Sequence, residues 1–116
     1  MDGEISGPDL EAELESDDRP LIVDIRNARQ FERLRIPDSV NIPLAELPQR
    51  VETLRDADHV VTVCPHGQAS VKAARLITSF EGFDGTVESL GCGLSGWDGP
   101  VEGEDITTEE SQDAPF

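Results

Sequence analysis

Three short apolar segments constrain the fold of this 116-residue chain more than any other feature of its sequence. They span residues 21–25, 59–63 and 86–90, and each has the length of a single β-strand. The first two are almost continuously apolar, which is typical of strands buried on both faces of a parallel sheet. A further short strand, residues 40–43, ends at a proline.

The segments between these strands carry helical signals. Residues 1–19 carry Ser6, then Pro8 near a helix start and two leucines at helical spacing, which predicts a short amphipathic helix; residues 27–33 are compatible with a second helix. A third helix is predicted from about residue 45, and a fourth from about residue 70 with small apolar side chains facing inward. Strands that alternate with helices predict an α/β sandwich, with a mainly parallel sheet flanked by helices on both faces.

The charge of the chain is strongly negative and unevenly distributed. It has 25 acidic residues against 9 basic ones, a formal net charge of −16 and a pI near 4.2, which argues against nucleic acid or an anionic membrane as partner. Residues 1–19 and 98–116 carry −7 each, so residues 20–97 are nearly neutral. Such an acidic, lysine-poor composition resembles that of proteins from salt-loving organisms.

Composition also predicts the domain organisation and the compartment. Residues 98–116 have no hydrophobic period and no basic residue, so we expect one domain over residues 1–97 and a disordered acidic tail. No apolar stretch reaches the roughly 18 residues of a membrane span, and the first residues lack the features of a signal peptide, which predicts a cytoplasmic protein. Two cysteines do not make a disulfide scaffold, and in the cytosol they indicate reactive or metal-binding chemistry.

Cys64 is the most informative of these two cysteines. It directly follows the apolar segment 59–63, and a short loop containing Gly67 joins it to the predicted helix. Backbone amides of such a loop, together with the positive end of the helix, would stabilise a thiolate and so favour a nucleophile. The candidate anion-binding residues are those of the loop: Pro65, His66, Gly67, Gln68, Ala69 and Ser70. The alternative is a buried structural cysteine at a strand end.

Four segments in the same order resemble the single-domain rhodanese family over about residues 5–97. They are residues 21–26 (LIVDIR), 36–44 (IPDSVNIPL), 61–70 (VTVCPHGQAS) and 90–97 (LGCGLSGW). The resemblance implies a three-layer rhodanese-like sandwich and a sulfurtransferase in which Cys64 accepts a sulfane sulfur as a persulfide. It also implies a small donor, thiosulfate or a persulfide, a thiol, cyanide or protein acceptor, and neither a metal nor an organic cofactor.

The chain departs from this family at several positions. Rhodaneses commonly carry arginines where this loop has Pro65 and Ala69, so anionic thiosulfate should be held less well and a persulfide donor becomes more suitable. A binding module without catalysis and a persulfide carrier for a sulfur-insertion pathway therefore stay open as alternatives. The related phosphatases place an arginine six residues after the cysteine, where this chain has Ser70, which argues against phosphatase activity.

Several other residues have two interpretations each. Asp24 and Arg26 either support the loop or form a structural ion pair, which the family favours. Cys92 replaces a family glycine; it is either a small substitute or a resolving thiol that attacks an oxidised Cys64. His66 is either a proton donor or partner of the thiolate, or a solvated loop residue.

The remaining candidate residues have simpler interpretations. A zinc site made of Cys64, His66 and Cys92 would lack a fourth ligand, so no metal is expected. His59 is expected at the surface. The arginines of residues 26–35 either steer an anionic substrate or pair with neighbouring acids.

Overall fold

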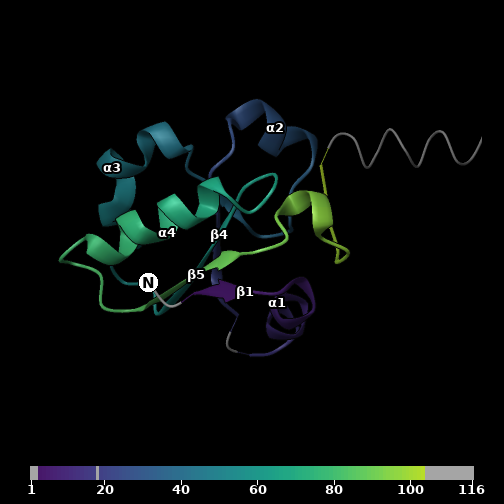
Figure 1. Ribbon diagram of the computed structural model, residues 1–116, viewed down its shortest axis with the longest axis horizontal. Helices are drawn as coiled ribbons and strands as arrows, with labels where there is room; N and C mark the ends of the chain where they lie inside the picture. Colours follow the sequence, from purple (N-terminus) through teal and green to yellow (C-terminus); the bar gives the residue numbers. More distant parts are fainter. Residues whose placement is uncertain (1–2, 18, 104–116) are drawn as a thin grey trace, which may run out of the picture.

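A parallel β-sheet forms the centre of the molecule. The computed structural model describes residues 3–17 and 19–103 (Figure 1). The five strands are β1 (Glu4–Ile5), β2 (Leu21–Asp24), β3 (Val40–Asn41), β4 (His59–Val63) and β5 (Thr86–Leu90). They are all parallel in the order β1-β5-β4-β2-β3, so the predicted mainly parallel sheet is confirmed. The sequence did not predict β1, because a two-residue strand is too short to show a period.

Helical elements cover both faces of the sheet, as the sequence predicts. The α-helices are α1 (Gly7–Leu14), α2 (Ala28–Arg33), α3 (Leu47–Arg50) and α4 (Ala69–Ser79), and the 3-10 turns are η1 (Leu44–Glu46), η2 (Val51–Leu54) and η3 (Leu94–Gly96). Helix α1 begins where expected, because Ser6 caps it by accepting the backbone N–H of Asp9 at 3.1 Å. Among the described residues, no helix has both the length and the apolar character to cross a bilayer.

The helix predicted from about residue 45 is instead divided into three short helical segments, η1, α3 and η2. Pro48 lies in the first turn of α3 and cannot donate a backbone hydrogen bond, so a continuous helix does not form through this segment. The side chains that the apolar spacing predicts to face inward are nevertheless buried: Leu47, Val51 and Leu54.

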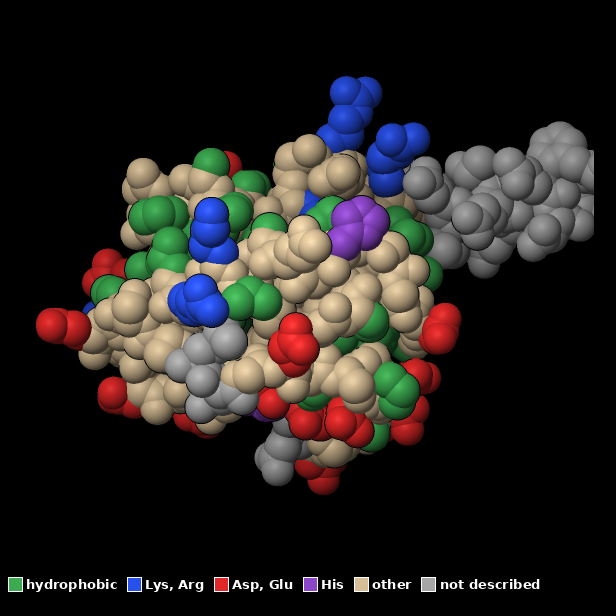
Figure 2. Space-filling view, in the orientation of Figure 1, with side chains coloured by type: hydrophobic (Ala, Val, Ile, Leu, Met, Phe, Trp, Pro, Cys, Tyr) green, Lys and Arg blue, Asp and Glu red, His purple; other side chains and the backbone are tan. Residues whose placement is uncertain are grey.

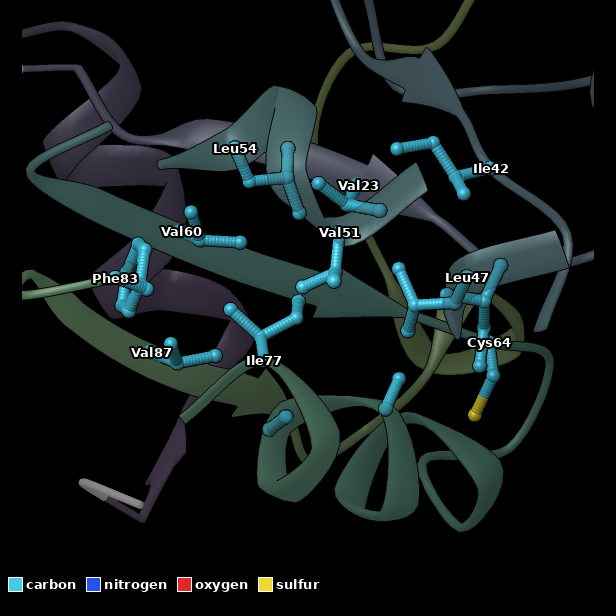
Figure 3. Packing of buried hydrophobic residues seen from close by; sticks show 13 residues of the cluster. Val23, Ile42, Leu47, Val51, Leu54, Val60, Cys64, Ile77, Phe83 and Val87 are labelled. Carbon is cyan, nitrogen blue, oxygen red and sulfur yellow. The ribbon is translucent and has the colours of Figure 1, made fainter. Parts of the chain in front are cut away.

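Two hydrophobic clusters hold the layers together, one on each face of the sheet. On the first face, shown in Figure 3, α3, η2 and α4 pack on alternate residues of the central strands, including Val23, Val60 and Val87. On the second face, α1 and η3 pack on the other alternate residues, including Ile22, Val61 and Leu90. The central strands β2, β4 and β5 thus present apolar side chains to both sides, which explains the apolar runs in the sequence.

Contacts with the rest of the fold continue after residue 97. Glu102 forms an isolated antiparallel bridge with Arg35, with backbone hydrogen bonds of 2.8 Å in both directions, and the indole N–H of Trp97 donates to the carbonyl of Pro100 at 3.0 Å. Residues within 98–103 therefore contact the domain predicted over residues 1–97. The rest of the predicted tail, residues 104–116, lies outside the described residues.

Candidate active site

Cys64 lies at the carboxyl end of β4, where the loop of residues 65–68 leads into α4. A second loop, residues 91–93 after β5, lies directly against it. Gly67 has φ +82° and Gly93 has φ +66°, and a Cβ on either would overlap backbone atoms of the facing loop. Glycine is required at both positions because the conformation is left-handed and the two backbones touch.

The sulfur of Cys64 is surrounded by hydrogen-bond donors. The backbone N–H of Gly67 donates to Sγ at 3.0 Å and that of Ser70 at 3.3 Å. The hydroxyl of Ser70 lies 3.4 Å from Sγ. The side chain of Cys64 is almost completely buried, and Figure 3 shows it at the end of the cluster beside α4. Within the loop selected from the sequence, the backbone amides of Gly67 and Ser70 thus donate to the sulfur.

These contacts act on the acidity of the thiol. Burial raises the pKa of Cys64, but hydrogen bonds from the Ser70 hydroxyl and from the backbone amides of Ser70, His66 and Gly67 lower it, and the net pKa lies below the ordinary value of 9.0. A larger fraction of Cys64 is therefore thiolate at neutral pH than for an ordinary cysteine. Since a thiolate is a better nucleophile than a thiol, these contacts favour nucleophilic reactivity at Cys64.

Behind Ser70 lies a small group of buried hydroxyls. Ser70 Oγ is 2.6 Å from Ser89 Oγ on β5, and the hydroxyl of Thr62 on β4 donates to the carbonyl of Ser70 at 2.7 Å. Thr62 and Ser89 are register neighbours in the sheet and are completely buried. Sequence reasoning missed both, although a polar residue at an inward position of an apolar strand was an available signal.

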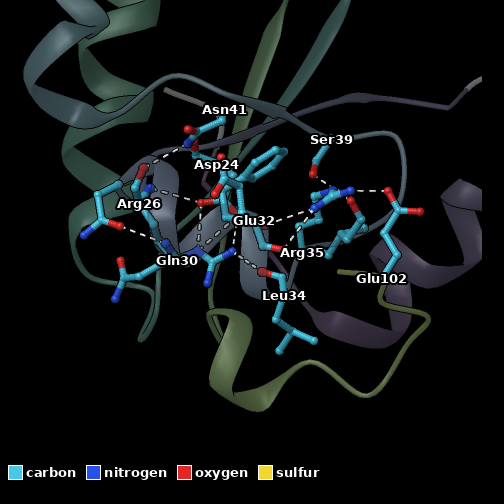
Figure 4. Close-up of polar contacts among 12 residues, drawn as sticks. Asp24, Arg26, Gln30, Glu32, Leu34, Arg35, Ser39, Asn41 and Glu102 are labelled. Carbon is cyan, nitrogen blue, oxygen red and sulfur yellow. Dashed lines mark hydrogen bonds and ion pairs between the residues drawn. The ribbon is translucent and has the colours of Figure 1, made fainter. Parts of the chain in front are cut away.

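Asp24 and Arg26 form an ion pair, and the structure buries both side chains (Figure 4). The guanidinium donates to both carboxylate oxygens of Asp24, at 2.7 to 3.1 Å, and also to the carbonyl of Leu34. The amide of Asn41 donates to the carbonyls of Asp24 and Arg26 at 3.0 and 2.9 Å. The charge of Arg26 is therefore already paired, and the residue fixes the loop after β2 beside the Cys64 loop.

The rim of the site is partly apolar and partly cationic. A cavity of about 190 Å³ adjoins the Cys64 loop and is lined by Arg26, Gln30, Leu34, Pro65, Leu94 and Ser95. Figure 2 shows Lys and Arg side chains over α2 and α4, whereas acidic side chains gather over β1 and α1. The exposed cations of these two helices are Arg29, Arg33, Lys72 and Arg75.

The other loop residues take different positions. His66 is exposed, and its ring Nδ1 lies 3.3 Å from the hydroxyl of Ser95, while its backbone amide is directed at Cys64. Gln68 and Ala69 are exposed and Pro65 is half-buried. Of the six loop residues selected from the sequence, the structure thus brings His66, Gly67 and Ser70 to the sulfur.

The structure does not bring Cys92 to Cys64. Cys64 packs in the cluster with α4, whereas Cys92 packs against the cluster on the α1 face, and its Sγ lies close to Gly7. The two thiols therefore face opposite sides of the sheet. This arrangement does not favour the resolving-thiol hypothesis, and it agrees with Cys92 as a small residue in place of glycine.

A second group of titratable side chains lies away from the Cys64 loop. His59, at the start of β4, has Nε2 2.7 Å from a carboxylate oxygen of Glu88 and Nδ1 3.5 Å from one of Glu13. These are the described residues whose ligand-type atoms come close enough to hold a metal ion, within 4.8 Å of one another. The sequence suggested that His59 lies at the surface. In the structure it is half-buried, and Glu13 of α1 lies beside it.

Comparison with known proteins shows the family of the chain. The family described as "Rhodanese-like domain" matches residues 6–99. The "Putative sulfur carrier protein YrkF" of Bacillus subtilis is 31% identical over 99 residues, which are 85% of this chain but only 52% of that protein. The "Putative sulfurtransferase YtwF" of the same organism is 29% identical over 85% of this chain and 93% of its own length. A rhodanese-like domain protein from Staphylococcus aureus superposes with a TM-score of 0.77 at 22% identity, over 89% of this chain and 98% of its own.

Proposed function

Because this chain belongs to the rhodanese-like domain family, we propose that it is a sulfurtransferase in which Cys64 carries the transferred sulfur as a persulfide. The observation that supports this proposal best is the set of donors around Sγ: the amides of Gly67 and Ser70 and the hydroxyl of Ser70. A structural cysteine needs no such donors, whereas a thiolate and a persulfide anion both need their charge stabilised.

The proposed reaction has two displacement steps. The Cys64 thiolate attacks the outer sulfur of a donor such as thiosulfate; the new S–S bond forms as the old one breaks, and sulfite leaves with its electron pair. A thiolate or cyanide then attacks the outer sulfur of the persulfide, and Cys64 leaves as the thiolate. Neither step changes the overall charge, and neither needs a metal or a redox cofactor. The amides hold the anion in every state of the cycle.

The test of this proposal is sulfur loading of Cys64. We expect intact mass spectrometry to show one added sulfur atom after incubation with thiosulfate or a polysulfide, and its loss when cyanide is added. Cys64→Ser should show no loading, because the nucleophile is missing. Cys92→Ser is the matched control and should load normally, since Cys92 faces the other side of the sheet. Loading of Cys64→Ser equal to that of the unaltered protein would refute the proposal.

The choice of donor follows from the charges of the site. Residues 65–70 carry no Lys or Arg side chain, and the guanidinium of Arg26 is bound to Asp24. A doubly charged donor such as thiosulfate is therefore held by amides alone, while a persulfide carries less charge. This favours a role as persulfide carrier that receives sulfur from a thiol persulfide and passes it to a protein acceptor; the sulfur carrier from Bacillus subtilis is similar to this chain.

Salt should increase the rate of sulfur loading from thiosulfate. The net charge of −16 repels an anionic donor at long range, and this repulsion is screened once the Debye length falls from about 30 Å in 0.01 M salt to about 3 Å in 1 M salt. We expect a rise of severalfold in the second-order rate constant over this range, measured by sulfite release. Alkylation of Cys64 by uncharged iodoacetamide, followed by mass spectrometry, is the control and should show a flat profile. A thiosulfate rate that falls with salt would indicate that the cations of α2 and α4 dominate instead.

A further inference from the structure

Two serine hydroxyls form a buried chain that ends at the sulfur of Cys64. Ser70 Oγ lies 3.4 Å from Sγ, and Ser89 Oγ lies 2.6 Å from Ser70 Oγ. Both serines have an exposed fraction of 0%. Ser89 comes from β5, 19 residues further along the chain. Among the described residues, it makes no hydrogen bond to the sulfur itself and reaches it only through Ser70.

The direction of this chain depends on the charge of Cys64. With a thiol, Sγ–H donates to Ser70 and Ser70 donates to Ser89, which leaves the Ser89 proton in need of another acceptor. With a thiolate, Ser89 donates to Ser70 and Ser70 donates to Sγ, so both hydroxyl protons are used. Among the described residues, the Ser89 hydroxyl has Ser70 Oγ as its hydrogen-bond partner. The pair is therefore best satisfied when Cys64 is ionised.

The surroundings hold the two hydroxyls in place. Thr62 binds the carbonyl of Ser70 at 2.7 Å, which anchors the first turn of α4 to β4. The backbone N–H of Ser89 donates to the carbonyl of Gly3 at 3.0 Å, which anchors β5 to the N-terminal segment. Since the site is closed to water on this side, a donor aimed at Ser70 strengthens the bond from Ser70 to the sulfur.

We propose that Ser89 is a positioning residue for the Cys64 nucleophile: its hydroxyl donates to Ser70 and so directs the Ser70 proton at the sulfur. The effect of Ser89 on the ionisation of Cys64 does not depend on the proposed function. Only its consequence for catalysis rests on that function. The hydroxyl pair reorients as Cys64 ionises, and it favours the thiolate without placing a charged side chain in the site. It thus compensates in part for the arginines that the loop lacks at residues 65 and 69.

The test is a pH titration of the single thiol in a Cys92→Ser background, followed by the ultraviolet absorbance of the thiolate. Ser89→Ala should move the midpoint of the titration to higher pH. At any pH below the midpoint, it should lower the thiolate fraction by about threefold. Ser70→Ala should lower the thiolate fraction by about tenfold, because the direct donor to the sulfur is lost. Ser89→Thr, which keeps the hydroxyl, should restore the original midpoint. Ser79→Ala, at an exposed serine on the same helix as Ser70, is the control and should leave the midpoint unchanged.

The double variant separates positioning from a merely structural role. If Ser89 acts through Ser70, then Ser89→Ala adds no further shift in a Ser70→Ala protein. An equal shift in both backgrounds, or no shift for Ser89→Ala alone, would overturn the proposal. Failure of sulfur loading would leave these titrations unaffected, because they follow ionisation of Cys64 and not transfer. The two proposals can therefore fail independently.

Discussion

Gly67→Ala should destabilise the protein by about 3 kcal/mol and slow sulfur loading of Cys64 by about tenfold to a hundredfold. An alanine at φ +82° carries the conformational cost of a left-handed residue, on the order of 1 kcal/mol. Its Cβ would also overlap the carbonyl oxygen of Gly91, a backbone atom that cannot move away alone. The loop of residues 65–68 must then shift, and the amide of Gly67 leaves the sulfur that it contacts at 3.0 Å.

Gly3→Ala is the matched control for this change. Gly3 also has a positive φ, +102°, but a Cβ there meets no atom within 4 Å. It should therefore cost only the conformational term, about 1 kcal/mol, and leave sulfur loading unchanged. Denaturant unfolding measures the first quantity and sulfite release the second. Equal stability and equal loading in the Gly67→Ala and Gly3→Ala proteins would contradict the close packing of the two loops.

The position of the Cys64 loop could be predicted from the sequence because local signals and topology agree there. The apolar residues 59–63 predict a strand, the small and polar residues after Cys64 predict a loop, and the spacing from residue 70 onwards predicts a helix. All three elements are present, with α4 starting one residue earlier at Ala69. In a parallel sheet, the end of such a strand is where ligands bind.

Features that depend on contacts between distant segments could not be predicted in this way. The Ser70–Ser89 contact joins residues 19 positions apart, and nothing in the local pattern of either residue indicates the other. The position of Cys92 is similar: adjacent strands predict two thiols at one edge of the sheet, but Cys64 and Cys92 pack with the clusters on opposite faces. The packing of residues 98–103 depends on the bridge between Arg35 and Glu102, which composition alone does not reveal.

The ion pair of Asp24 could be predicted from the sequence, but its burial could not. Its pairing with Arg26 follows from their spacing at a strand end, yet only the structure shows that Asp24 has an exposed fraction of 1% and that the guanidinium is also covered. Burial changes the consequence of substitution, because an exposed pair contributes little to stability whereas breaking a buried pair leaves a charge without compensation.

Asp24→Asn should therefore lower the free energy of unfolding by about 3–5 kcal/mol. Asparagine keeps the size of the side chain but leaves the Arg26 guanidinium buried without its counter-ion. Glu46→Gln, in the exposed pair with Arg50, is the control and should change stability by less than about 1 kcal/mol. Denaturant unfolding measures both variants.

The double variant Asp24→Asn/Arg26→Met tests whether the cost arises from the unpaired charge. It removes both ionic groups and keeps an apolar chain of similar length in place of the guanidinium, so it should be more stable than Asp24→Asn alone. The same stability in the single and double variants would show that the cost comes instead from the lost hydrogen bonds of the loop after β2. Because Arg26 lines the cavity beside Pro65, the single variant should also slow sulfur loading, whereas Glu46→Gln should not.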